Sequence, residues 1–311
     1  MTQPETIGVL LMAYGTPDTL ENVEPYYTHI RGGRTPRREL VQELRERYEL
    51  VGGTTPLLEI TEATRAALET RLNQESTRYR VILGMKHWHP FIEEGVRQMA
   101  EEGIGRAVGL VLAPHFSEMS IAGYYRYVDA AQEKLGTDMA ISRIESWHLH
   151  PPYLMAVAAR IRAALAEFPA GSQPTVIFTA HSLPERILQS GDPYPRQLGE
   201  TSEALAVMLG LERWTFSYQS AGRTPEPWLG PDLVDTVHRL ADEGITAILV
   251  ASVGFVSDHL EILYDIDQEA QEAARERGIT LKRTAMLNAS PDFVEGLAAL
   301  VHSRVEEAIA L

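Results

Sequence analysis

The chain has 311 residues, 44% of them hydrophobic, which is enough for one large or two ordinary packed domains. Its formal net charge of -15 argues against nucleic acid as a partner, because neutralising phosphates requires a basic face. The sequence has no cysteine, which excludes disulfides, thiolate zinc sites, cysteine-ligated iron–sulfur clusters and cysteine nucleophiles.

Eight short runs rich in β-branched and other apolar residues predict strands, and most gaps between them have the apolar spacing of helices. The strands are expected near residues 6–13, 79–84, 106–113, 139–145, 174–180, 213–218, 245–253 and 279–286. Helices are expected at 91–103, 125–135, 153–167, 196–209 and 232–243, with a final amphipathic helix over 291–311. This alternation is typical of parallel α/β sheets.

The two halves of the chain resemble each other. The first predicted strand ends in Ala13-Tyr-Gly-Thr-Pro17 and the fifth in Ala180-His-Ser-Leu-Pro184. We therefore predict an α/β protein with two similar Rossmann-like domains, residues 1–148 and 149–311. Each would be a mainly parallel four-stranded sheet flanked by helices, with the active site in the cleft between them. The terminal helix over 291–311 can pack on the first domain as well as on the second.

Two of the predicted strands lead to side chains suited to chemistry. The run over 174–180 is followed by His181, and the run that ends at Val253 opens into a segment that carries Glu261. In open α/β sheets, ligands bind at the carboxyl ends of the strands. The pair would offer one neutral nitrogen ligand and one anionic oxygen ligand or base. From the residues alone, His181 is equally well explained as a structural histidine hydrogen-bonded to a loop.

An acidic row follows Glu261, with Asp265, Glu269 and Glu272 at spacings of four, four and three residues. On a helix these side chains share one side. Because like charges at that spacing disfavour a helix, the row is either well solvated or compensated by a cation.

Residues 31–47 are locally basic in an acidic chain. This stretch would receive an anionic small molecule, or it is a solvated helix face with Glu/Arg pairs. The glycine-rich nucleotide motifs, His-Glu-x-x-His and Gly-x-Ser-x-Gly are missing from the sequence, so nucleotide-binding, zinc-protease and serine-hydrolase interpretations lose their usual support.

A set of motifs, taken in order, resembles the ferrochelatases from about residue 6 to the C-terminus. The motifs are Met12-Ala-Tyr-Gly-Thr-Pro17, Tyr26-Tyr-Thr-His-Ile-Arg31, Gly52-Gly-Thr-Thr-Pro-Leu57, Ala113-Pro-His-Phe-Ser117, Ala180-His-Ser-Leu-Pro-Glu185, Gly191-Asp-Pro-Tyr194, Pro227-Trp-Leu-Gly-Pro231 and Gly254-Phe-Val-Ser-Asp-His-Leu-Glu261. The likeness is closest to the soluble, monomeric enzymes of Gram-positive bacteria that insert iron into coproporphyrin III in heme biosynthesis.

The resemblance implies a metal-chelating lyase with catalytic, metal-binding His181 and Glu261. It places Asp265 and Glu269 as outer carboxylates on an irregular, π-type helix that passes metal or protons. It assigns contacts with the porphyrin to Tyr14, Arg31, Arg47, Tyr48, Thr55 and Tyr124. Ferrous iron would be a substrate, with no organic cofactor and no iron–sulfur cluster.

Further expectations concern the binding partners and the cellular location of the protein. No stretch approaches the roughly 20 apolar residues of a membrane span, and no secretory signal is evident, so we expect a cytoplasmic protein without an integral membrane segment. We expect a monomer that binds porphyrin and ferrous iron, does not bind nucleic acid, and meets a heme-accepting protein transiently.

Two alternative functions stay open on the residues alone. One is a cobalt or nickel chelatase of another tetrapyrrole pathway, and the other is a noncatalytic tetrapyrrole-binding protein. The residues also leave open the choice between coproporphyrin III and protoporphyrin IX, and the order of proton removal and metal entry.

Overall fold

The computed structural model describes residues 6–309, which form two compact units. The N-terminal unit comprises the described residues of 6–113, 120–147 and 288–309, and the C-terminal unit comprises Pro114–Met119 and His148–Leu287. Whether these units are domains with a boundary at residues 148 and 149 stays a prediction. Residues 310 and 311 of the expected final helix lie outside the described part of the chain.

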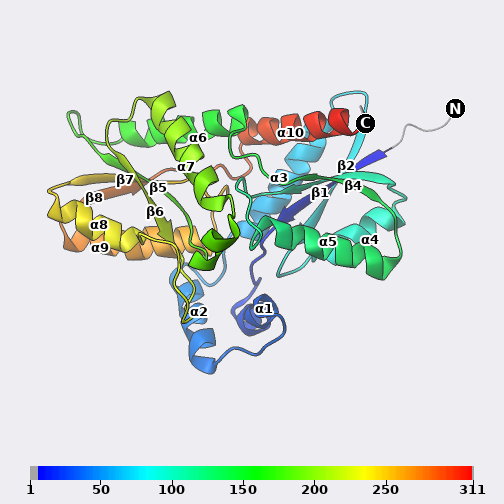
Figure 1. Cartoon of the computed structure of the whole chain (residues 1–311), viewed down its shortest axis with the longest axis horizontal. Coiled ribbons are helices and arrows are strands. Elements are labelled where there is room, and N and C mark those ends of the chain that lie inside the picture. Colours follow the sequence, from blue (N-terminus) through cyan, green and yellow to red (C-terminus); the bar gives the residue numbers. More distant parts are fainter. Residues whose placement is uncertain (1–5, 310–311) are drawn as a thin grey trace. The chain divides into compact units, whose positions relative to one another are not determined.

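The N-terminal unit is built on four parallel strands in the order β2-β1-β3-β4. Helices α4 and α5 cover one face of this sheet, and α3 and α10 cover the other (Figure 1). The elements are β1 Thr6–Ala13, η1 Leu20–Asn22, α1 Val23–Ile30, α2 Arg38–Leu50, α3 Leu57–Leu72, β2 Arg78–Met85, α4 Ile92–Glu101, β3 Arg106–Val111, α5 Ile121–Leu135, β4 Ala140–Ile144 and α10 Pro291–Ile309.

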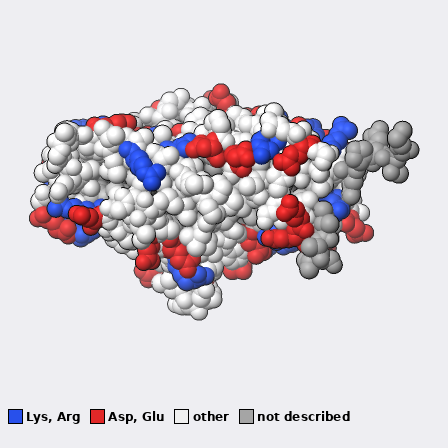
Figure 2. Space-filling view, turned by 90° about the horizontal axis from the view of Figure 1, so that it is seen from above, with Lys and Arg blue, Asp and Glu red and all other residues white. Residues whose placement is uncertain are grey.

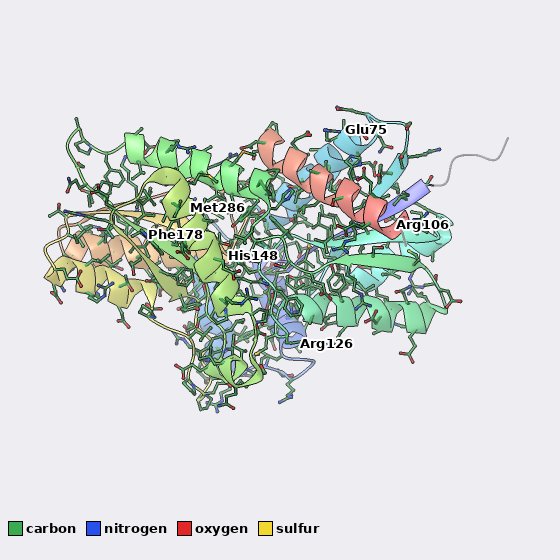
Figure 3. The ribbon with its side chains drawn as sticks, turned by 45° about the horizontal axis from the view of Figure 1, so that its top comes forward. Glu75, Arg106, Arg126, His148, Phe178 and Met286 are labelled. Carbon is green, nitrogen blue, oxygen red and sulfur yellow. The ribbon has the colours of Figure 1, made fainter. Side chains whose placement is uncertain are left out.

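Helix α10 belongs to the N-terminal unit although it lies at the far end of the sequence. It packs on α3, and Arg71 donates to both carboxylate oxygens of Glu295 at 2.5 and 2.8 Å. Nearby, His302 on α10 lies 3.7 Å from the carboxylate of Glu75, which Figure 3 labels. The first sheet is therefore covered on one face by a helix from residues 291–309.

The C-terminal unit repeats the same topology, with four parallel strands in the order β6-β5-β7-β8. Helices α6 and α7 lie on one face, and α8 and α9 lie on the other (Figure 1). The elements are α6 Pro151–Ala166, β5 Thr175–His181, the 3-10 helix η2 Glu185–Ser190, α7 Tyr194–Leu209, β6 Trp214–Gln219, α8 Leu233–Asp242, β7 Ala247–Ser252, the π-helix η3 Ile262–Ala270, α9 Gln271–Glu276 and β8 Thr280–Arg283.

The central strand of this unit, β5, is buried at every position before His181. Phe178, labelled in Figure 3, is fully buried. A sheet with helices on both faces produces such continuous burial, and the apolar run in the sequence reflects it. Ile262 and Ile266 of the π-helix pack in the same core as Ile177 and Val250, so the core itself anchors the segment that follows Glu261.

The eight predicted strands and the α/β class are confirmed, as are two four-stranded parallel sheets flanked by helices. The six predicted helices correspond to α4, α5, α6, α7, α8 and α10. Within residues 6–309, no helix combines the length and the apolar character needed to cross a membrane. Charges of both signs are interspersed on the face shown in Figure 2.

Candidate functional site

His181 is the last residue of β5, and its ring orientation follows from a local hydrogen bond. Its Nδ1 contacts the carbonyl oxygen of Ser182, which can only accept, so Nδ1 carries the proton. In the neutral ring, Nε2 then keeps a bare lone pair, the form that binds a metal ion or accepts a proton. The hydroxyl of Tyr194 donates to the His181 carbonyl at 2.9 Å and fixes the backbone at this strand end.

Glu261 faces that bare nitrogen. Its Oε1 lies 3.6 Å from His181 Nε2, and the two side chains keep 29% and 33% of their surface exposed. The Glu261 carbonyl accepts from Gln219 Nε2 at 2.8 Å, which ties the residue to the end of β6. Two acceptors that face each other are stabilised by a proton or a cation between them, and solvent can reach this pair. The structure thus brings together the two residues predicted as catalytic.

His259 contacts the second oxygen of the same carboxylate, with Nε2 3.5 Å from Glu261 Oε2. Its Nδ1 donates to the Ser257 carbonyl at 2.9 Å. Burial opposes protonation of this imidazole, but Glu261, the hydrogen bond to Ser257 and the charge of Asp265 together outweigh burial and raise the pKa of His259. The Glu261 carboxylate therefore lies between two imidazoles, with His259 Nε2 beside Oε2 and His181 Nε2 beside Oε1.

Replacing Glu261 with glutamine should lower the pKa of His259. The change removes the carboxylate that favours the imidazolium and leaves the burial that opposes it. A pH titration of the His259 ring signals by NMR measures the shift, with Glu203→Gln, an exposed position of α7, as the matched control. An unchanged His259 titration in Glu261→Gln would show that the two side chains do not interact in solution.

Asp265 is buried on the π-helix, with 5% of its surface exposed, and Ser220 Oγ donates to its carboxylate. Ser220 follows β6 and adopts a φ of 61°, a left-handed conformation that is uncommon for serine. Glu269 is half-buried further along the π-helix, and Glu272 is exposed beyond its end. The π-type helix implied by the resemblance is present over Ile262–Ala270.

Aromatic side chains surround the histidine. The rings of Trp228 and Phe255 lie 6.4 and 6.5 Å from the ring of His181, and Phe255 also lies 4.5 Å from the ring of His259. These apolar faces suit a flat, hydrophobic ligand.

The predicted porphyrin-contacting residues all belong to the N-terminal unit. Tyr14 follows β1, is 41% exposed, and has its ring centroid 4.6 Å from that of His87. The His87 backbone N–H donates to the Tyr14 carbonyl at 2.9 Å. Burial, with the charges of Lys86 and His29, lowers the pKa of His87 to about 3, so this ring stays neutral beside Tyr14.

Tyr48 and Thr55 are linked through a residue that sequence reasoning did not single out. Thr16 Oγ1 lies 3.2 Å from the Tyr48 hydroxyl and 3.0 Å from Thr55 Oγ1, and all three residues are buried. The chain of hydroxyls connects the segment after β1 to α2 and to the turn before α3. Thr16 lies in the Ala-Tyr-Gly-Thr-Pro motif, and this position in the sequence was the signal that could have identified it as a site residue.

The remaining predicted contacts differ in exposure. Tyr124 on α5 is buried, and Lys86 Nζ lies 4.8 Å from the centre of its ring. Arg31 is exposed at the end of α1, with its guanidinium 5.9 Å from the ring of Tyr27. Arg47 lies 3.6 Å from Glu43 on α2. Glu/Arg pairing of this kind supports the solvated-helix interpretation of residues 31–47, and the porphyrin contacts of Arg31 and Arg47 stay predictions.

Within residues 6–309, no group of three or more histidine and acidic side chains is arranged to hold a metal ion. His181 and Glu261 form a pair of potential ligands at 3.6 Å. The sequence analysis gave no role to His259 and overlooked Gln219 and Ser220. Applying to β6 the strand-end rule that selected His181 would have identified the latter two, because Gln219 pairs with His181 in the sheet.

Comparisons with known proteins find relatives over nearly the whole chain. A family model described as ferrochelatase matches residues 6–305. A ferrochelatase of Herpetosiphon aurantiacus is 48% identical over 297 residues, covering 94% of this chain and 97% of that protein. A coproporphyrin III ferrochelatase of Geobacillus kaustophilus is 45% identical over 308 residues, covering 97% of each.

Among solved structures, SirB from Bacillus subtilis with Fe3+ superposes with a TM-score of 0.61 at 12% identity, covering 98% of each chain. The cobalt complex of the sirohydrochlorin chelatase SirB from Bacillus subtilis subspecies spizizenii gives a TM-score of 0.58 at 10% identity, covering 97% of this chain and 96% of that one. At these identities the matches show a shared fold alone. From the family match over residues 6–305, the chain belongs to the ferrochelatase family.

Proposed function

We propose that the chain is an enzyme that inserts ferrous iron into coproporphyrin III. The observation that carries the proposal is that Nε2 of His181 faces the Glu261 carboxylate at 3.6 Å, in a chain that matches the ferrochelatase family over residues 6–305. The family match favours ferrous iron over the cobalt or nickel alternative, and an enzyme over a noncatalytic binding protein. The choice of coproporphyrin III rests on relatives such as that of Geobacillus kaustophilus.

The chemistry of insertion sets three tasks. A flat porphyrin shields its inner nitrogens and carries two N–H protons, so the ring must bend, the protons must leave, and the ferrous ion must lose water. Bending the porphyrin ring costs roughly 1–5 kcal/mol of strain. Favourable contacts between the protein and parts of the porphyrin away from the reacting centre can offset this cost. Tyr14, Arg31, Arg47, Tyr48, Thr55 and Tyr124 are the proposed contacts.

His181 and Glu261 would carry out the reaction itself. The Nε2 lone pair of His181 can bind ferrous iron or accept a pyrrole proton, and Glu261 takes the complementary role. His259 contacts the second oxygen of the Glu261 carboxylate, and the Glu261 charge raises the pKa of the His259 imidazole. Buried Asp265 and the half-buried Glu269 follow along the π-helix and would pass protons or metal onward.

This mechanism requires no organic cofactor, and with no cysteine in the chain it uses no cysteine-ligated iron–sulfur cluster. We further propose that the enzyme acts as a cytoplasmic monomer and passes its product to a heme-accepting protein. Its resemblance to soluble, monomeric ferrochelatases supports these proposals.

An anaerobic assay with ferrous iron and either coproporphyrin III or protoporphyrin IX tests both activity and substrate. Free porphyrin fluoresces and its iron complex does not, so insertion is followed as loss of fluorescence. We expect faster loss with coproporphyrin III, whose additional propionates offer more anionic groups for arginine. Equal rates, or a faster rate with protoporphyrin IX, would reject the substrate assignment. No loss with either porphyrin would reject ferrochelatase activity.

A further inference from the structure

Arg283, the last residue of β8, joins two acidic residues from different segments of the C-terminal unit. Its Nε lies 2.7 Å from Asp267 Oδ1 and its Nη2 lies 2.9 Å from Asp267 Oδ2, a two-pronged hydrogen bond. The same Nη2 lies 3.1 Å from Asp258 Oδ1. The Arg283 and Asp258 side chains are each 20% exposed, so water screens these contacts less than it screens a surface pair.

The two carboxylates flank Glu261 along the chain. Asp258 lies three residues before Glu261, in the loop that also carries His259, and Asp267 lies six residues after it on the π-helix. A single guanidinium therefore restrains the chain on both sides of the proposed metal ligand. A planar fork of this kind fixes direction as well as distance.

The π-helix needs such restraints because i→i+5 bonding is rarely the preferred helical form. Other side chains hold the same segment: Ser220 donates to Asp265, and Gln271 Nε2 donates to the Leu281 carbonyl at 3.2 Å. Arg283 differs from these two because it also holds Asp258, and thus the loop before Glu261.

We propose that Arg283 is a positioning residue for metal insertion: by holding Asp258 and Asp267 together, it keeps Glu261 within reach of His181 Nε2. This inference rests on the proposed function. Arg283 contacts Asp258 and Asp267 on either side of Glu261, so its effect on the reaction passes through the backbone of residues 258–267.

The test compares Arg283→Lys with Arg283→Met in the anaerobic assay with ferrous iron and coproporphyrin III. Lysine restores the positive charge but has one compact ammonium group, which cannot reproduce the fork on Asp267 while also reaching Asp258. We expect Arg283→Lys to retain a melting temperature near that of the wild type and to lose about 10- to 100-fold in kcat/KM for iron, the usual cost of removing a partner that orients a metal ligand. Porphyrin affinity, measured by fluorescence titration, should stay unchanged.

Arg239→Lys is the matched control, because the exposed side chain of Arg239 on α8 pairs at 2.6 Å with Glu243, which follows that helix. If Arg283→Lys keeps both the melting temperature and the turnover per folded molecule of the wild type, a positive charge at this position is sufficient and the inference is wrong. A wild-type turnover per folded molecule in Arg283→Met would by itself show that the inference is wrong. These results would leave the proposed function intact, whereas an absence of fluorescence loss with the wild-type protein and either porphyrin would reject the proposed function itself.

Discussion

Replacing His181 with alanine is expected to lower the rate of iron insertion by at least about 100-fold, the usual contribution of a positioned proton acceptor. The side chain supplies the lone pair that faces Glu261, and alanine offers neither a ligand nor a base. Porphyrin should still bind, because the proposed contacts with the ring and its propionates come from other residues. Turnover is measured by loss of porphyrin fluorescence, and binding by titration in the absence of iron.

His89→Ala serves as the control, because the His89 side chain is 62% exposed and pairs with Glu94 rather than with the site. It should turn over at close to the wild-type rate. Turnover by His181→Ala at a comparable rate would remove His181 from the mechanism. Loss of porphyrin binding in that variant would instead make it a substrate-binding residue.

Replacing Gly254 with alanine should reduce both stability and turnover. A Cβ at this position would collide with the Cβ of Ala180 and lie 2.8 Å from its Cα, while the Gly254 N–H donates to the Thr179 carbonyl at 3.1 Å. Relief of the collision requires the loop after β7 to move away from β5, which separates the segments that carry His181 and Glu261. Overpacking of this kind costs about 1–3 kcal/mol of the free energy of unfolding.

Thermal unfolding and the insertion assay together measure this effect. Gly199→Ala is the control, since its added Cβ would meet nothing within 4 Å apart from its chain neighbours and the backbone of α7, and alanine favours a helix. The control should be neutral or slightly stabilising. A Gly254→Ala protein with wild-type melting temperature and turnover would mean that the strand end accommodates the extra methyl group without moving.

The sheets could be predicted from sequence because strands buried on both faces leave continuous apolar runs, as in Val176 to Ala180. Helices α1, α2 and α3 were harder to define. In α2 only Tyr48 is buried and charges dominate, so the residues that form the helix also suit an anion-binding segment. The α2 helix contains internal pairs such as Arg45 with Glu49, which spacing allows but does not require.

The site was predicted only in part, because a strand-end position identifies single residues and not their partners. His181 and Glu261 could be selected from the ends of two strands. The contact of Ser220 with Asp265 joins residues 45 positions apart, and that of Arg283 with Asp267 joins β8 to the π-helix. Such contacts depend on the order β6-β5-β7-β8 and on side-chain reach, neither of which is encoded in a local pattern.

Helix α10 gives the chain a constraint on its order of assembly. During synthesis the C-terminal unit has all of its residues once Leu287 has emerged from the ribosome, whereas the N-terminal unit still lacks the helix that packs on α3 and pairs Glu295 with Arg71. Although domains generally fold from the N-terminus during translation, the unit made first is here the last to be completed. Until residues 291–309 have emerged, the side of α3 that packs on α10 is left for solvent or a chaperone to cover.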